Sequence, residues 1–262
     1  MNIQSPTRRF RTIWISDVHI GTRQCRADAL LDFLRWHDCD ILYLVGDIID
    51  GWSLRKSWFW REIDNELVQR ILHKARTGTR VIYVPGNHDE AARDYCGIDV
   101  GGIEIRDEAI HHTADGRRLL VLHGDEFDAV VRYSRWLAHL GDHAYQFALS
   151  LNHWFNVVRR RLGYPYWSLS AWLKGAVKNA VQYISRFEVA VADAARARGV
   201  QGVVCGHIHR AEIRDIRGLL YCNDGDWVES CTALVEHNDG RLEIVHWLEA
   251  EQMQPQFLAV AG

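Results

Sequence analysis

Five short blocks of the chain bring together acidic, imidazole and amide side chains, each directly after an apolar run. A lone Asp-x-His or His-x-His pair is usually incidental, but five such blocks in order are not a coincidence. Ligands gathered at the strand ends of an α/β sheet are where such folds place function. The blocks therefore predict one common site. In chain order they are Ser16-Asp17-Val18-His19, Gly46-Asp47-Ile48-Ile49-Asp50, Gly86-Asn87-His88-Asp89, His123-Gly124-Asp125 and Gly206-His207-Ile208-His209.

The donor types in these blocks indicate two divalent metal ions. Carboxylates, imidazoles and one amide oxygen, without cysteine, suit Mn²⁺, Fe²⁺ or Zn²⁺ and argue against a structural thiolate zinc site. Seven ligands are too many for one ion but fit two ions that share a carboxylate, which we assign to Asp47. Two such ions lie roughly 3.5–4 Å apart and clamp the phosphoryl oxygens during in-line attack. The candidate ligands are Asp17, His19, Asp47, Asn87, His123, His207 and His209.

The spacing of Asp17 and His19 suggests how one ion is gripped. Residues i and i+2 of an extended segment point the same way, so we expect both side chains on the same ion. Glycine stands beside the ligands in the second to fifth blocks. Since glycine lets the backbone turn tightly, it suits a crowded site.

The elements that must position these blocks are strands and helices in alternation. Short apolar runs at Arg11–Ser16, Ile41–Val45 and Arg80–Val84 predict buried strands. Apolar residues four apart predict a helix over Arg61–Arg76, followed by a stop at Gly78. The alternation indicates a layered α/β fold. Residues 103–122 are expected to be β, and later strands are predicted at Gln201–Cys205, Glu212–Ile216, Leu219–Tyr221, Thr232–His237 and Arg241–Trp247.

Residues 130–198 differ from the sequence on either side, 1–129 and 199–262, which we assign to one core. Apolar residues from Ala144 to Leu162 recur at steps of three and four, which predicts a helix. A second helical stretch runs from about Ser168 to Arg198. We therefore expect a helical hairpin inserted as a cap within the same domain.

The charge of this insert suggests its partner. Residues 131–186 carry a net charge of +7 and the rest of the chain −10. Basic residues interleaved with tryptophans suit a lipid-linked substrate or an anionic membrane surface. Candidate substrate contacts are Arg132, Lys174 and Lys178, with Asn87 beside the metals. The alternative is that the tryptophans are core residues and the basic residues a solvated face.

Composition excludes several classes of protein. The chain has 262 residues, of which 48% are hydrophobic and 25% charged, as in ordinary globular proteins. No apolar run is long enough for a transmembrane helix, and the start lacks the apolar region of a signal peptide. The six cysteines are scattered without a CxxC pair, which favours reduced thiols. We expect a cytoplasmic protein with peripheral contact to the inner face of the membrane.

Taken together, the five blocks resemble the calcineurin-like metallophosphoesterases. The resemblance implies a four-layer αββα β-sandwich, here with the inserted helical hairpin cap. It also implies that His88 is not a ligand but stabilises the phosphoryl group or protonates the leaving oxygen, oriented by Asp50. The implied ligand sets are Asp17, His19, Asp47 and His209 for one metal, and Asp47, Asn87, His123 and His207 for the other.

The position of the insert resembles that in the UDP-2,3-diacylglucosamine diphosphatase group of lipid A biosynthesis. There a helical insert covers the acyl chains, and the pyrophosphate is cleaved to release UMP, usually with Mn²⁺. Two features depart from that group: His88 stands where it carries Arg, and Gly206–Ala211 differs from its Gly-His-Thr-His-x-Pro ending. We expect a phosphorylated substrate, lipid-linked or nucleotide, and Mn²⁺. The alternatives are a phosphodiesterase or nuclease with another substrate, which the absence of a DNA-binding module disfavours, and an inactive membrane-docking module.

Overall fold

The computed structural model describes residues 8–130 and 169–248. The chain folds into two compact units, one made of Met1–Asp125 with Val191–Gly262 and the other of Glu126–Ala190. The first unit contains two β-sheets, which confirms the predicted α/β class. Residues 131–168 lie outside the described parts of the chain, so the first helix of the predicted hairpin and the boundaries of the insert stay predictions.

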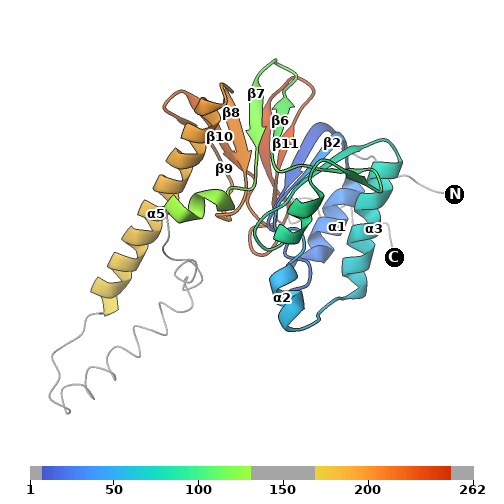
Figure 1. Ribbon diagram of the computed structural model, residues 1–262, viewed down its shortest axis with the longest axis horizontal. Helices are drawn as coiled ribbons and strands as arrows, with labels where there is room; N and C mark the ends of the chain where they lie inside the picture. The colour runs from blue at the N-terminus through green and yellow to red at the C-terminus, as the bar shows by residue number, and fades with distance from the viewer. Residues whose placement is uncertain (1–7, 131–168, 249–262) are drawn as a thin grey trace, which may run out of the picture. The chain divides into compact units, whose positions relative to one another are not determined.

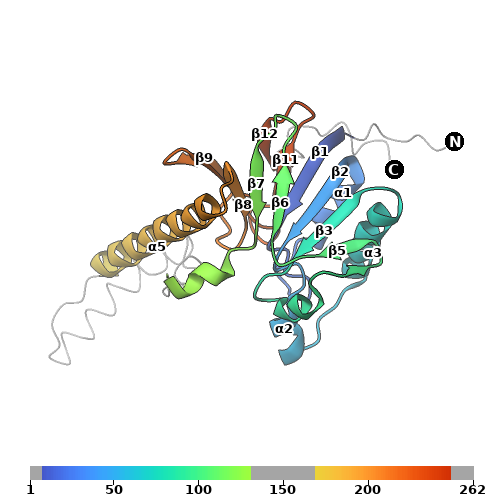
Figure 2. The ribbon, with the colours of Figure 1, turned by 45° about the horizontal axis from the view of Figure 1, so that its top comes forward.

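The larger sheet carries three of the five blocks at one edge. Its strands β1, β2, β3 and β5 are parallel neighbours and lie side by side in Figure 2. Because β1, β2 and β3 run in the same direction, the loops that follow them leave the sheet at the same edge. In spatial order the sheet consists of β12 (Leu242–His246), β11 (Thr232–Glu236), β1 (Arg8–Ile15), β2 (His37–Val45), β3 (Arg80–Val84), β5 (Ile103–Ile105) and β4 (Asp99–Val100).

The smaller sheet carries the other two blocks. Strands β7 and β8 pair in parallel, with Leu120 opposite Val203, so His123 and His207 follow neighbouring strand ends. The backbone N–H of Gly206 donates to the carbonyl of His123 at 3.2 Å, which continues the pairing past the strands. In spatial order this sheet consists of β6 (Ala109–His112), β7 (Arg118–Val121), β8 (Gly202–Cys205), β10 (Leu219–Asn223) and β9 (Glu212–Ile216).

The second halves of β1 and β2 are buried on both faces, which explains the apolar runs Ile13–Ile15 and Leu42–Val45. Trp14 and Tyr43 belong to a core shared with Val121 of the smaller sheet, whereas Ile13 and Leu42 belong to the core on the opposite face. Alternate residues of a strand point to opposite faces, so one apolar run serves two cores.

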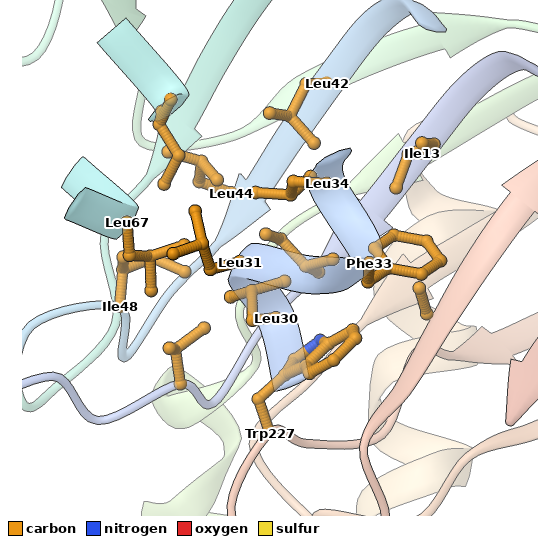
Figure 3. Packing of buried hydrophobic residues seen from close by; sticks show 14 of the residues in the cluster. Ile13, Leu30, Leu31, Phe33, Leu34, Leu42, Leu44, Ile48, Leu67 and Trp227 are labelled. Atoms are coloured by element: carbon orange, nitrogen blue, oxygen red, sulfur yellow. The ribbon is translucent and has the colours of Figure 1, made fainter. Parts of the chain in front are cut away.

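Helices α1 (Ala27–Trp36) and α3 (Glu62–Arg76) cover the second face of the larger sheet, and Figure 1 shows them together beside β2. In Figure 3 the leucines of α1 point toward Leu42 and Leu44 of the sheet and toward Leu67 of α3. The sequence analysis predicted α3 but missed α1. Its buried Ala27, Leu30, Leu31 and Leu34 have the spacing of a helical stripe, so the signal was present.

The other helices in the described parts of the chain are α2 (Gly51–Lys56) and α5 (Leu169–Ala197), with 3₁₀ turns η1 (Glu90–Tyr95) and η2 (Asp125–Val130). The second predicted stretch of the insert corresponds to α5. Its residues 191–197 belong to the first unit, where Val191 and Ala195 are buried and Arg196 donates to the carbonyl of Ile216 in β9. Of the helices that the structure describes, none combines the length and the apolar character needed to cross a membrane.

Candidate metal centre

The loops after β1 and β2 are held against each other by backbone hydrogen bonds. The N–H of Asp17 donates to the carbonyl of Gly46 at 3.0 Å, and those of Val18 and His19 donate to the carbonyl of Asp47 at 3.0 and 2.9 Å. These bonds bring two predicted ligands of one block next to the predicted bridge of another. The contact depends on the parallel pairing of β1 with β2.

The candidate ligands are held on strained backbone. A left-handed conformation costs an L-residue roughly 1–2 kcal/mol and persists where the surrounding structure imposes it, often at functional sites. The prediction that Asp17 and His19 lie on an extended segment is therefore wrong: both turn to the left-handed region, and their side chains meet for that reason. Of the seven non-glycine residues with positive φ in the described parts of the chain, five are candidate ligands, namely Asp17 (50°), His19 (53°), Asp47 (53°), His207 (70°) and His209 (53°).

The first cluster is built around the buried carboxylate of Asp17. Its Oδ2 accepts hydrogen bonds from Ser16 Oγ at 2.6 Å and from the N–H of His207 at 2.8 Å. Its Oδ1 faces two imidazoles, 3.0 Å from His209 Nε2 and 4.0 Å from His19 Nε2. One oxygen is thus positioned by hydrogen bonds while the other is directed at the predicted ligands of one ion.

The carboxylate of Asp47 lies between two clusters. Its Oδ2 is 3.8 Å from His19 Nε2, whereas its Oδ1 is 3.5 Å from His123 Nε2. Asp47, His123 and His207 offer donor atoms within 4.8 Å of one another, as do Asp17, His19 and His209. A carboxylate with one oxygen toward each group has the placement that a bridging ligand requires.

His123 is set up to bind through one nitrogen. Its Nδ1 donates to the carbonyl of Val45 at 2.8 Å, which fixes the ring and leaves Nε2 as the ligating atom. That Nε2 is buried and has no hydrogen-bond partner among the described residues. A buried orphaned imidazole nitrogen aimed at a carboxylate fits a divalent ion between them.

The electrostatics of the centre favour positive charge. Burial raises the pKa of Asp47, but the charge of His123 outweighs it and lowers the pKa to about 2. Burial lowers the pKa of His123, but the nearby carboxylates of Asp47 and Asp17 raise it to about 10. Burial also lowers the pKa of His209, and Asp17 raises it to about 9. A divalent ion supplies the positive charge that these carboxylates attract and binds the imidazoles in their neutral form.

Two glycines permit the close approach of the blocks. A Cβ on Gly86 would lie 2.7 Å from His123 Cδ2 and closer still to Asp47 Oδ1, and one on Gly206 would lie 2.5 Å from Asp17 Oδ2. Neither position has space for a side chain. Asn87, the predicted amide ligand, is half-buried in the same loop as Gly86.

His88 and Asp50 lie beside the candidate ligands. Asp50 Oδ2 is 3.0 Å from His88 Nδ1 and accepts from His19 Nδ1 at 3.2 Å, so it contacts two imidazoles and not only the predicted one. Burial opposes ionisation of Asp50, but hydrogen bonds from both imidazoles lower its pKa below the usual value. His88 Nε2 is 3.9 Å from Asp47 Oδ2, close enough to group it geometrically with His19 and Asp47.

Supporting residues were missed by the sequence analysis. Asp89 received no role, yet its carboxylate accepts from the N–H groups of Ile48 at 2.7 Å and Gly86 at 2.6 Å, and so joins the loops after β2 and β3. Asp224 is buried, and its Oδ1 lies within hydrogen-bond distance of Ser16 Oγ, at 2.7 Å. Burial raises the pKa of Asp224 well above its usual value.

A sequence signal for Asp224 did exist. Asp224 directly follows strand β10, as the predicted ligands follow their strands. Because β10 pairs in parallel with β8, Asp224 lies at the same end of the sheet as Gly206 and His207.

The predicted substrate contacts are not located. Arg132 lies outside the described residues, and Lys174 and Lys178 belong to the part of α5 whose side chains are not described.

The chain is similar to several known proteins. The family model for calcineurin-like phosphoesterases matches residues 10–211. The chain is 26% identical over 256 residues to a UDP-2,3-diacylglucosamine hydrolase of Shewanella pealeana, covering 88% of this chain and 95% of that protein. It is 27% identical over 168 residues to the DNA polymerase II small subunit of Methanothermobacter thermautotrophicus, covering 52% of this chain and 35% of that one. The solved structure of a phosphopantetheinyl hydrolase from Mycobacterium tuberculosis aligns with 16% identity and a TM-score of 0.41, over 85% of this chain and 91% of that one.

Proposed function

Because the chain belongs to the calcineurin-like phosphoesterase family and is a metal-dependent phosphoester hydrolase, we propose that it cleaves a phosphodiester or pyrophosphate with two divalent ions. The observation that carries the proposal is the carboxylate of Asp47, whose two oxygens face different imidazoles. The mixture of oxygen and imidazole donors suits Mn²⁺, Fe²⁺ or Zn²⁺, and of these we propose Mn²⁺, the metal that the resemblance to the diphosphatase group implies. The ligand sets are Asp17, His19, Asp47 and His209 for one ion, and Asp47, Asn87, His123 and His207 for the other.

The protein residues complete the chemistry. Bound divalent ions supply an activated water and neutralise charge on the phosphoryl oxygens. His88 presents Nε2 toward this centre and donates a proton from it to the leaving oxygen. The carboxylate of Asp50 lies 3.0 Å from Nδ1 and would orient the ring by its charge, with Nε2 directed inward.

For the substrate, we propose a lipid-linked nucleotide of the UDP-2,3-diacylglucosamine type. The similarity to the Shewanella pealeana hydrolase extends over 88% of this chain. Residues 131–186, with a net charge of +7, suit a pyrophosphate and an anionic membrane. Residues 130–198 would act as a cap, with Arg132, Lys174 and Lys178 contacting anionic groups of the substrate at the cytoplasmic face of the membrane.

A second candidate is a phosphodiesterase that acts on nucleic acid. The similarity to a DNA polymerase II small subunit favours it, although this chain spans about a third of that protein. Basic residues interleaved with aromatics also bind single strands, and such binding weakens steeply with salt.

The deciding experiment compares three substrates with added Mn²⁺: UDP-2,3-diacylglucosamine, a single-stranded oligonucleotide and bis-p-nitrophenyl phosphate. Release of UMP at a rate well above the rate of bis-p-nitrophenyl phosphate hydrolysis supports the lipid substrate. In that case a variant with both Lys174→Ala and Lys178→Ala should raise KM for the lipid substrate more than it lowers kcat. Faster cleavage of the oligonucleotide supports the second candidate. Metal binding without turnover of any of the three would leave a docking module and overturn the proposed function.

A further inference from the structure

The short helix α2 begins directly beside His88. Asp50 caps it, since Asp50 Oδ1 accepts from the N–H of Ser53 at 2.7 Å. The N–H of Gly51 donates to the backbone carbonyl of His88 at 2.9 Å. The first turn of α2 is therefore fixed to the loop that carries His88, by backbone contact and by the side chain of Asp50.

Trp52, in the same turn, lies against the imidazole of His88. The ring centroids are 4.3 Å apart and the planes are inclined by 37°. The indole Nε1 donates to Glu90 Oε1 at 3.4 Å. Trp52 is 37% exposed, and α2, all of whose residues the structure describes, has no buried side chain. Trp52 is thus not a core residue, and its contacts lie around the site.

The imidazole of His88 needs such a contact to keep its orientation. The torsion that rotates a histidine ring is broad, so the ring is not held by its own rotamer preference. Asp50 lies at Nδ1, and the ring of His19 meets that of His88 edge-on at 4.6 Å. The indole covers the ring itself, and in this arrangement Nε2 points to Asp47 Oδ2 at 3.9 Å.

We propose that Trp52 is a positioning residue for His88: the indole restricts rotation of the imidazole and keeps Nε2 directed at the leaving oxygen. The proposal rests on the proposed role of His88 as proton donor. Small displacements of a positioned catalytic group have large effects on rate, so loss of the indole should be visible in kcat. The effect should depend on how much the leaving group needs a proton.

The kinetic test uses Trp52→Ala and Trp52→Phe in the full chain with Mn²⁺. For diphenyl phosphate, whose leaving group is basic, Trp52→Ala should lower kcat roughly tenfold to a hundredfold. For bis-p-nitrophenyl phosphate, whose leaving group needs little protonation, the loss should be much smaller. Trp52→Phe keeps a stacked ring and should restore most of the rate. Equal losses on both substrates, or no rescue by phenylalanine, would overturn the proposal.

Trp58→Ala is the matched control. Trp58 is 76% exposed and stacks on Trp60 at 6.0 Å, so its removal deletes a neighbouring indole away from His88. It should leave both rates unchanged. A selective loss for diphenyl phosphate in Trp58→Ala would show that any surface tryptophan has this effect and would overturn the assignment to Trp52.

A double-mutant cycle separates positioning from a general structural effect. If Trp52 acts through His88, Trp52→Ala should cause no further loss of kcat in a His88→Ala background, because the group it positions is gone. Additive losses contradict the proposal.

A readout without turnover is the ring-proton resonance of His88, measured with Zn²⁺ in place of Mn²⁺ because paramagnetic Mn²⁺ would broaden it. The indole ring current should shift it in the wild type, and Trp52→Leu should remove the shift. An unshifted wild-type resonance would refute the stacking, even if the chain hydrolysed none of the diesters and the proposed function itself failed.

Discussion

Two clusters of buried charge in the first unit differ in how their carboxylates are satisfied. Glu236, fully buried in β11, accepts from Arg11 NH1 at 2.7 Å, Thr12 Oγ1 at 2.9 Å, His111 Nε2 at 2.8 Å and the N–H of Ala114 at 2.7 Å. Burial opposes its ionisation, but the hydrogen bonds from His111 and its other partners lower its pKa. This cluster is complete without any ligand.

At the metal centre the carboxylates are not satisfied in this way. Asp17 and Asp47 direct oxygens at imidazoles, and the buried Nε2 of His123 has no hydrogen-bond partner among the described residues. The backbone there is left-handed, whereas Arg11, Thr12, His111 and Glu236 lie on the regular strands β1, β6 and β11. Buried charge on relaxed backbone with every partner present indicates a structural role, and orphaned polar atoms on strained backbone indicate a ligand site.

The largest effect should follow loss of the shared carboxylate. Asp47→Ala removes a ligand from both ions, so we expect loss of bound metal and loss of hydrolysis below detection. Metal content by elemental analysis and turnover of bis-p-nitrophenyl phosphate check this. Asparagine also tolerates left-handed backbone, so Asp47→Asn removes the negative charge without adding backbone strain. Two equivalents of Mn²⁺ retained in both variants would refute the bridging role.

A smaller effect is expected at His88. His88→Ala should retain both metal ions but lower kcat for diphenyl phosphate, whose leaving group needs a proton, by roughly 10²–10⁴-fold, since a proton donor is lost and the ligands remain. Metal content and kcat are measured on the same preparation. If the substitution emptied the site, His88 would be a ligand, as its grouping with His19 and Asp47 also allows.

Substitution in the Glu236 cluster should lower the stability of the fold and leave metal binding and turnover unchanged. Glu236→Gln removes the buried negative charge that faces the half-buried guanidinium of Arg11, and breaking a buried pair costs at most about 3–5 kcal/mol of folding free energy. Denaturant unfolding should show this loss, while metal content and kcat at a temperature well below the unfolding transition stay unchanged. A loss of metal without a loss of stability would contradict the distinction between the two clusters.

The smallest expected effect is on the pH dependence of the free energy of unfolding. The pKa of Glu236 is lowered from its ordinary value of 4.5 on folding. Its contribution to stability is therefore fully present above about pH 4.5 and is lost as the pH falls through the lower pKa of the folded state. Unfolding free energies measured between about pH 5 and pH 3 should fall more steeply for the wild type than for Glu236→Gln. Parallel slopes would show that Glu236 is not the titrating group.

Local patterns predicted much of this fold. The bounds of β3 and β9 agree with the predicted strands, and α3 begins one residue after its predicted start. Strand β3 is an apolar run between Gly78-Thr79 and Pro85-Gly86, and α3 has apolar residues four apart and ends before Gly78. Helix α1 was missed although its apolar spacing was helical, because it runs into β2 without a loop to separate them.

Residue type and order alone determined the chemistry of the site. Apolar runs that end in Asp, His, Asn and Gly predicted seven donors at strand ends, because both strand period and ligand preference are local properties. Only the tertiary structure decided that five of these donors sit on left-handed backbone, that the oxygens of Asp47 face different imidazoles, and that Trp52 lies against His88. Those features depend on which strands pair and on which loops the pairing brings into contact. Contacts between residues that are distant in the chain produce no periodic pattern in the sequence, so they cannot be predicted from it.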